Sequence, residues 1–169
     1  MTDRRGLGIA VLTVTDTRTL ATDHSGAYLV EALAAAGHRL VARQLVGDDR
    51  YQIRKLVSAW IADPEVDVVL TTGGTGFGDR DVTPEAVSVL FDRVVDGFGE
   101  LFRQLSWQEI GSSTLQSRAV AGIANRTAIF CLPGSSGACR TGWEGILREQ
   151  LDRGHRPCNI AELLGAERS

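Results

Sequence analysis

The stretch from Val66 to Ala86 constrains the fold more than any other part of this chain. It begins with the apolar, β-branched run Val66–Thr72, which predicts a buried strand. The loop Gly73–Gly78 follows with four glycines, which can adopt positive φ and let a ligand approach backbone N–H groups. Thr83 is placed to cap a helix that has Pro84 in its first turn. Open α/β sheets bind phosphorylated ligands at such strand-to-helix loops, so the stretch predicts a phosphate-binding site.

The glycine loop could instead be a flexible surface turn. A solvated turn, however, needs neither four glycines nor the Asp79-Arg80-Asp81 cluster beside a helix start. The loop also lacks the Gly-Lys-Ser/Thr ending of a Walker loop. We therefore expect any phosphate chemistry here to depend on carboxylates and a metal ion.

Strands and helices alternate along the chain. Apolar runs predict strands, and amphipathic stretches that end at glycine or proline predict helices. A βαβαβ order implies a parallel sheet with helices on both faces, so we predict an α/β fold of three layers (α/β/α) with a mostly parallel central sheet. The predicted strands are 9–14, 39–46, 66–72 and 127–132, and the predicted helices lie near 26–36, 51–62, 84–91, 101–109 and 139–151.

Two aspartates are expected at the carboxyl ends of these strands. Asp48 follows the strand 39–46, and Asp81 lies in the glycine-rich stretch, so both fall on one edge of a parallel sheet. Two carboxylates beside such a loop suit a Mg²⁺ ion that shares phosphate oxygens with a nucleotide. Helix capping or turn formation is the alternative for each aspartate. Both interpretations stay open for Asp48, whereas the loop favours a functional role for Asp81.

A second glycine-containing loop, Pro133–Ala138, has the same setting between a buried strand and a helix. Alone it could be an ordinary strand-to-helix turn, but its recurrence at the same edge of the sheet supports a binding role. Trp107 is expected to be a core or subunit-interface residue rather than a base-stacking platform, because no basic residues are interleaved around it.

The composition fits one globular domain, residues 1–169, with flexible ends at 1–7 and 156–169. A net charge of −3 argues against a general nucleic-acid surface, and no apolar run is long enough to span a bilayer, so we expect neither nucleic acid nor a membrane as partner. The three cysteines are odd in number and lack paired spacing, which favours a reduced, cytoplasmic location over a disulfide framework or a zinc site.

The motifs of this chain resemble those of the molybdenum cofactor biosynthesis proteins of the MoaB/Mog type. The glycine-rich stretch, read as Leu70–Gly76 with Arg80–Ala86, carries the most specific part of this resemblance. The likeness extends from Ile9 to about Pro157. Further matching motifs, in the same order, are Gly97–Glu100, Leu115–Arg118 and Leu132–Ser135; the stretches 57–62, 112–122 and 138–141 resemble the B branch of the family.

The resemblance implies a molybdopterin-binding domain. Active members of the family use ATP and Mg²⁺ to adenylylate molybdopterin, releasing pyrophosphate before molybdate is inserted. In this chain the resemblance makes Asp48 and Asp81 the catalytic and metal-binding residues. The substrate-binding positions that it implies are Thr72, Gly73, Gly74, Thr75, Gly76, Ser117, Arg118, Pro133, Gly134 and Ser135.

Two features bear on whether the chain is an active enzyme of this kind. The Arg-Asp-Val-Thr-Pro sequence at 80–84 is intact, which favours a molybdopterin adenylyltransferase. Many members carry a Pro-Lys pair where this chain has Ser136 and Gly137, and Arg140 is the cation we expect to compensate for the missing lysine. A non-catalytic molybdopterin carrier is the alternative, while a molybdate insertase is disfavoured because the chain has one short domain.

The resemblance also implies partners. Members of the family that this chain resembles form trimers or hexamers and pass their product to a molybdate insertase. Trp60, Trp107 and Trp143 lie on otherwise apolar helix faces, which is more aromatic surface than one small sheet needs to cover. We therefore expect a homotrimer or a homohexamer.

Overall fold

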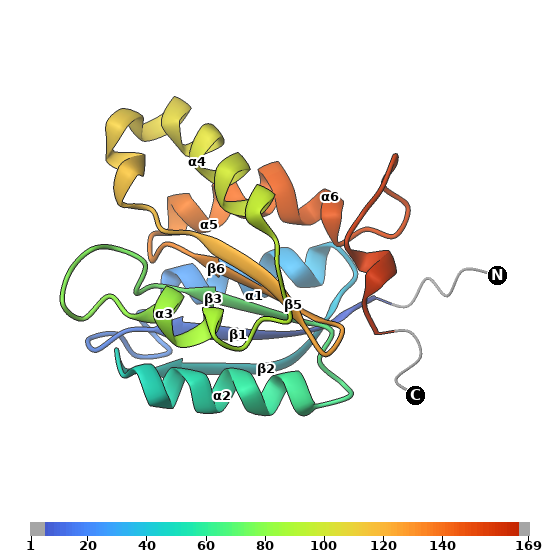
Figure 1. The fold of residues 1–169 in the computed structure, drawn as a ribbon, viewed down its shortest axis with the longest axis horizontal. Helices are drawn as coiled ribbons and strands as arrows, with labels where there is room; N and C mark the ends of the chain where they lie inside the picture. The colour runs from blue at the N-terminus through green and yellow to red at the C-terminus, as the bar shows by residue number, and fades with distance from the viewer. Residues whose placement is uncertain (1–5, 166–169) are drawn as a thin grey trace.

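A six-stranded sheet runs through the middle of the molecule and separates two layers of helices (Figure 1). The computed structural model describes residues 6–165. The strand order is β2-β1-β3-β6-β5-β4; the first four strands are parallel, and β5 and β4 each run antiparallel to the preceding neighbour. The strands are β1 (Gly8–Val14), β2 (Arg39–Val46), β3 (Val68–Thr72), β4 (Arg93–Val94), β5 (Val120–Ala124) and β6 (Thr127–Leu132).

Helices cover both faces of the sheet. Helices α1 (His24–Ala35), α4 (Asp96–Ile110), α5 (Ser136–Gly142) and α6 (Arg148–Gln150) pack on one face, and α2 (Arg50–Ala62) and α3 (Thr83–Ser88) pack on the other (Figure 1). Every residue of β1 is buried, because a strand covered on both faces has no solvent side. Three further helical segments lie within residues 6–165: 3₁₀ turns at Gly111–Gln116 and Ala161–Leu163, and a π-helical turn at Trp143–Leu147.

The structure confirms the predicted three-layer α/β fold. The strands 39–46 and 127–132 have the predicted bounds. The helix predicted near 139–151 is a continuous run of α5, the π-helical turn and α6. Its inward residues pack in the core as the helical spacing indicates: Trp143, Ile146, Leu147 and Leu151 are all buried.

Thr83 does not cap α3, contrary to the prediction. The helix begins at Thr83 itself, and Val82 occupies the cap position without a side-chain hydrogen bond. The hydroxyl of Thr83 points back to the glycine loop, where it donates to the carbonyl of Gly73 at 2.9 Å. The helix ends at Ser88, three residues before the predicted Phe91, because the chain turns there toward β4.

The tryptophans differ from the expectation of surplus aromatic surface. Trp60 is 7% exposed and Trp143 1% exposed, so both are covered by the core of a single chain. Trp107 is 59% exposed and lies outside that core. Trp60 and Trp143 therefore contradict the expectation of surplus aromatic surface, whereas the exposed Trp107 agrees with it.

Part of the segment expected to be a flexible end is packed. Ala161 and Leu164 are buried in the same cluster as the core residues of α1 and of the π-helical turn, and Leu7 at the other end of the chain joins them. The outer parts of the expected flexible ends, residues 1–5 and 166–169, lie outside the described residues. Among residues 6–165, no helix has both the length and the apolarity needed to cross a bilayer.

Candidate functional site

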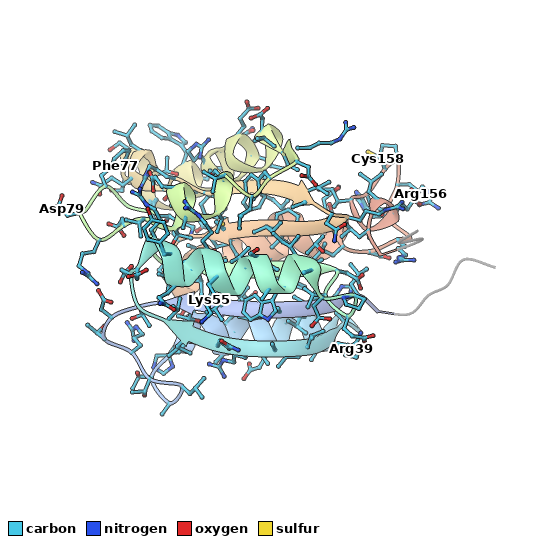
Figure 2. All side chains as sticks on the ribbon, turned by 60° about the horizontal axis from the view of Figure 1, so that its bottom comes forward. Arg39, Lys55, Phe77, Asp79, Arg156 and Cys158 are labelled. Carbon is cyan, nitrogen blue, oxygen red and sulfur yellow. The ribbon has the colours of Figure 1, made fainter. Side chains whose placement is uncertain are left out.

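A cavity of about 580 Å³ opens at the carboxyl edge of the parallel strands. The loops that follow β1, β2, β3 and β6 line it, because parallel strands deliver all of these loops to one edge of the sheet. Figure 2 shows Phe77 and Asp79 on the loop after β3, at the end of the molecule opposite Arg156 and Cys158. The cavity brings together ten of the predicted site residues: Asp48, Thr72, Gly73, Gly74, Thr75, Gly76, Asp81, Pro133, Gly134 and Ser135.

The glycine loop needs glycine at two positions. Gly73 has φ +102° and Gly74 has φ +72°, in the region that side chains rarely adopt. A Cβ on Gly73 would lie 2.3 Å from the carbonyl oxygen of Val14, and one on Gly74 would lie 2.2 Å from Oγ1 of Thr83. The loop therefore runs directly over the end of β1, and this close approach brings its backbone into the cavity lining.

The second loop is held against the first by side-chain hydroxyls. Thr72 Oγ1 donates to the carbonyl of Pro133 at 2.9 Å, and Ser25 Oγ at the start of α1 donates to the carbonyl of Gly134 at 2.8 Å. A Cβ on Gly134 would lie 3.2 Å from the Cα of Gly73, so the two glycine loops are in contact. Ser135 caps α5, because its Oγ accepts the backbone N–H of Ala138 at 3.0 Å.

Asp48 lies beside a second acid that the sequence did not single out. Oδ1 of Asp16 accepts the backbone N–H of Asp48 at 3.0 Å, and Oδ2 of Asp16 accepts Nε–H of Arg80 at 2.6 Å. The Arg80 hydrogen bond and the Asp48 amide lower the pKa of Asp16 to about 2. Burial and the adjacent Asp16 carboxylate raise the pKa of Asp48 to about 6.

Asp81 is held by its own loop. Its Oδ2 accepts the N–H of Gly78 at 2.9 Å, and a Cβ on Gly76 or Gly78 would lie 2.8 Å from that oxygen. Its Oδ1 accepts no hydrogen bond from residues 6–165, and the charge of Asp81 contributes to raising the pKa of Asp48. The two predicted acids therefore face one cavity and are close enough to interact electrostatically.

The donor set fits Mg²⁺ bound jointly with a nucleotide. Mg²⁺ prefers oxygen ligands and is commonly held by one or two carboxylates together with substrate phosphates. Asp48 and Asp81 supply two such carboxylates at the cavity. Within residues 6–165, no cluster of three or more acidic, histidine or cysteine side chains could form an all-protein cage. Phosphate oxygens and water would therefore have to complete the coordination.

Arg118 lies behind the glycine loop, outside the cavity lining. Its Nε and Nη2 donate to the carbonyl of Gly76 at 2.9 and 2.7 Å, and Nη2 also donates to the carbonyl of Asp81 at 3.0 Å. The guanidinium also pairs with Glu85 and lies 5.1 Å from the ring centre of Phe77. These contacts direct its hydrogen-bond donors to the loop, so the structure shows Arg118 holding the loop in place.

Ser117 and Arg140 also lie outside the cavity lining. The carbonyl of Ser117 accepts Nη1–H of Arg103 at 3.3 Å, and the neighbouring Gln116 lines the cavity. Arg140 lies over the ring of Tyr28, 4.6 Å from its centre. The structure thus places the cation expected to compensate for the missing lysine on an aromatic ring of α1. A different cation, Arg18, does line the cavity.

The acid that sequence reasoning missed lies in the loop after β1. Asp16 follows the end of β1 by two residues, as Asp48 follows the end of β2 by two residues. This shared offset was a signal that could have identified Asp16. Asp23, further along the same loop, caps α1 by accepting the N–H of Gly26 at 2.9 Å, while Ser25 in the first turn of α1 holds the second loop.

Comparison with known proteins identifies the family of this chain. A family model described as a probable molybdopterin binding domain matches residues 10–153. Molybdenum cofactor biosynthesis protein B of Escherichia coli K12 is 58% identical over 152 residues, which cover 90% of this chain and 89% of that protein.

Solved structures give the same result. A crystal structure of a molybdenum cofactor biosynthesis protein B is 43% identical with a TM-score of 0.88, covering 95% of this chain and 97% of that one. The tungsten cofactor synthesizing protein MoaB of Pyrococcus furiosus is 36% identical with a TM-score of 0.77, covering 86% and 92% of the two chains. The family match over most of the chain and the high identity to these relatives place it in molybdenum cofactor biosynthesis, and the chain belongs to the molybdopterin-binding MoaB/Mog family.

Proposed function

We propose that this protein is a molybdopterin adenylyltransferase that uses Mg-ATP. The observation that carries this proposal is the meeting of Asp48 and Asp81 at one cavity with both glycine loops. A protein that only binds a pterin needs the loops but has no need for two metal-competent carboxylates beside them. Transfer of an adenylyl group needs both, because it combines phosphate binding with charge neutralisation.

The proposed reaction joins two phosphorylated substrates. An oxygen of the molybdopterin phosphate forms a bond to the α-phosphorus of ATP, and the bond from that phosphorus to the oxygen bridging to the β-phosphate breaks. Pyrophosphate leaves with that bridging oxygen, and adenylated molybdopterin remains. Such transfers depend on positioning and electrostatic stabilisation more than on covalent help from the protein.

The residues of the chain have separate roles in this proposal. Backbone N–H groups of Gly74–Gly76, Gly134 and Ser135 hold phosphate oxygens, since glycine-rich loops can present several amides to an anion. Pro133 has no N–H and the N–H of Gly73 donates to a β6 carbonyl at 3.0 Å, so these two residues shape the cavity wall. Asp48 and Asp81 hold Mg²⁺, which offsets the charge that develops on the departing pyrophosphate. Arg118 keeps the first loop in shape through the carbonyls of Gly76 and Asp81.

A direct test is incubation of the protein with molybdopterin, ATP and Mg²⁺, followed by mass detection of the adenylated product. Product that requires both ATP and Mg²⁺ supports the proposal. Tight molybdopterin binding without product supports the alternative, a non-catalytic carrier of the same pathway. In either case we propose a cytoplasmic location and transfer of the bound pterin to a molybdate insertase.

We also propose that the protein assembles as a homotrimer or homohexamer. Large apolar side chains remain exposed along α4 and the 3₁₀ turn that follows it, with Trp107 59% and Leu115 78% exposed. Leu101 and Ile110 of α4 are exposed as well. Several large exposed apolar side chains within one segment are typical of protein interfaces, and another copy of the chain is the proposed partner.

A further inference from the structure

One carboxylate outside the proposed metal ligands ties three loops of the site together. Asp16, after β1, accepts the amide N–H of Asp48, after β2, at 3.0 Å. The same carboxylate accepts Nε–H of Arg80, after β3, at 2.6 Å. These bonds join positions 32 and 64 residues apart in the sequence. Asp16 is thus bonded to one proposed metal ligand and to the residue immediately before the other.

We propose that Asp16 is a positioning residue that sets the spacing between the carboxylates of Asp48 and Asp81. The proposal rests on the adenylyltransferase function, because that function gives these two acids a shared metal ion. Fixing the amide of Asp48 fixes the backbone from which its carboxylate extends. Fixing the side chain of Arg80 restrains the backbone immediately before Asp81. The N–H of Gly78 restrains the side chain of Asp81 from within the same loop.

The bonding of Asp16 favours positioning over a third ligand role. Both of its oxygens already accept hydrogen bonds, one from the Asp48 amide and one from the Arg80 guanidinium. By contrast, the hydrogen bond that Asp81 accepts from its own loop goes to Oδ2, which leaves Oδ1 available to a metal ion. The outer carboxylates of a metal site commonly act in this way, orienting the ligands without touching the metal.

Arg80 contributes charge balance to the same arrangement. Three aspartates at one cavity repel one another, and an isolated carboxylate beside Asp48 would oppose its ionisation. The guanidinium of Arg80 pairs with Asp16 and offsets that charge. The Asp16–Arg80 pair therefore restrains the loops, and Arg80 offsets part of the repulsion that Asp16 exerts on Asp48.

The test compares Asp16→Ala with Asp16→Asn and with the control Asp79→Ala. Asp79 is an exposed carboxylate next to Arg80 that projects from the loop (Figure 2). Mn²⁺ affinity is measured by electron paramagnetic resonance in the presence of a non-hydrolysable ATP analogue, together with molybdopterin affinity by fluorescence and kcat. Thermal unfolding of each variant checks that it is folded.

We expect Asp16→Ala to weaken Mn²⁺ binding by about 10- to 100-fold, the usual effect of removing a residue that orients a metal ligand. Asp16→Asn retains an acceptor for the Asp48 amide but loses the ion pair, so its Mn²⁺ affinity should fall between those of Asp16→Ala and the wild type. Molybdopterin affinity should stay close to that of the wild type in all variants, and Asp79→Ala should match the wild type throughout.

Mn²⁺ affinity and kcat of Asp16→Ala equal to those of Asp79→Ala would overturn the positioning role. If Asp16→Ala does not fold, wild-type Mn²⁺ affinity in Asp16→Asn overturns it instead. A wild-type protein that binds no Mn²⁺ with the analogue also overturns it. A different outcome separates the two proposals: the wild type binds Mn²⁺, Asp16→Ala does not, and the wild type still forms no adenylated product. That outcome overturns the adenylyltransferase proposal and leaves the positioning role standing.

Discussion

Thr83 begins α3 and also fixes the glycine loop, because its buried hydroxyl donates to the carbonyl of Gly73 at 2.9 Å. Its backbone N–H donates to the carbonyl of Gly74 at 3.0 Å. One residue thus satisfies two consecutive carbonyls of a loop whose backbone has positive φ. The start of α3 and the shape of the candidate phosphate site are consequently set by the same contacts.

Replacing this hydroxyl should loosen the loop. Thr83→Val keeps the branched shape but leaves the carbonyl of Gly73 without its side-chain donor, which should lower the free energy of unfolding by about 1–3 kcal/mol. Urea unfolding measures this change. Ser88→Ala, at the exposed last residue of the same helix, is the control and should change the free energy by less than about 0.5 kcal/mol. Equal stability of Thr83→Val and Ser88→Ala would contradict the assigned role.

Gly73→Ala should destabilise the protein more strongly. The added Cβ would meet the carbonyl oxygen of Val14 at 2.3 Å, and the residue would have to hold φ +102°. Backbone strain alone costs about 1–3 kcal/mol, and the clash adds to it. Gly97→Ala is the matched control, because nothing lies within 4 Å of its added Cβ and alanine favours the helix α4. Urea unfolding should therefore give opposite signs for the two changes.

Asp81→Asn should separate catalysis from binding. The change keeps the size of the side chain but removes the charge that would hold Mg²⁺ on the nucleotide. Electrostatic contributions of this type are worth roughly 3–4 kcal/mol, so adenylated product should form about two to three orders of magnitude more slowly. Molybdopterin affinity should change little, because the glycine loops remain. Asp48→Asn should also slow turnover. Equal turnover of Asp81→Asn and the wild type would exclude the role given to Asp81.

His38 should make stability depend on pH. Burial lowers its pKa below 6.5, and its Nδ1 accepts the N–H of Leu7 at 3.1 Å, which only the ring with an unprotonated Nδ1 can do. In the window between the folded pKa and 6.5, the unfolded chain binds more protons than the folded chain. The free energy of unfolding should therefore fall as the pH falls through that window, and level off below the folded pKa.

Urea unfolding between pH 5 and pH 8 would measure the contribution of His38. His38→Gln removes the titrating ring, so the part of the pH dependence that arises here should disappear. His24→Gln, at the exposed first residue of α1, is the control and should retain the slope of the wild type. A slope that survives unchanged in His38→Gln would show that other groups cause it.

The assembly proposal predicts no appreciable monomer in sedimentation equilibrium at micromolar concentration. Trp107→Ala should shift the distribution toward smaller species, because truncating a large aromatic side chain at an interface commonly costs more than 1 kcal/mol. Tyr51→Ala removes an aromatic side chain that is similarly exposed on α2, and it should leave the distribution unchanged. A wild-type protein that sediments as a monomer would refute the proposal.

The sequence was informative where short-range patterns decide the structure. The bounds of β2 follow from the alternation of residue types along 39–46, and those of β6 follow from a buried apolar run. The inward face of 139–151 follows from helical spacing. The edge of the sheet that carries the cavity also follows from the sequence, since an alternating order of strands and helices gives parallel strands whose carboxyl ends coincide. Asp48 and Asp81 were placed at that edge for this reason.

Only the tertiary structure decided which polar groups meet at that edge. Asp16 and Arg80 are 64 residues apart, Arg118 and Gly76 are 42 apart, and Ser25 and Gly134 are 109 apart, so no local pattern predicts these pairs. A buried carbonyl needs a donor from whichever segment the fold brings near it, and packing chooses that segment. For the same reason the sequence placed Thr83 as a helix cap, whereas in the folded chain its hydroxyl holds the glycine loop. Arg118, which the family resemblance makes a substrate-binding residue, donates to carbonyls of the same loop.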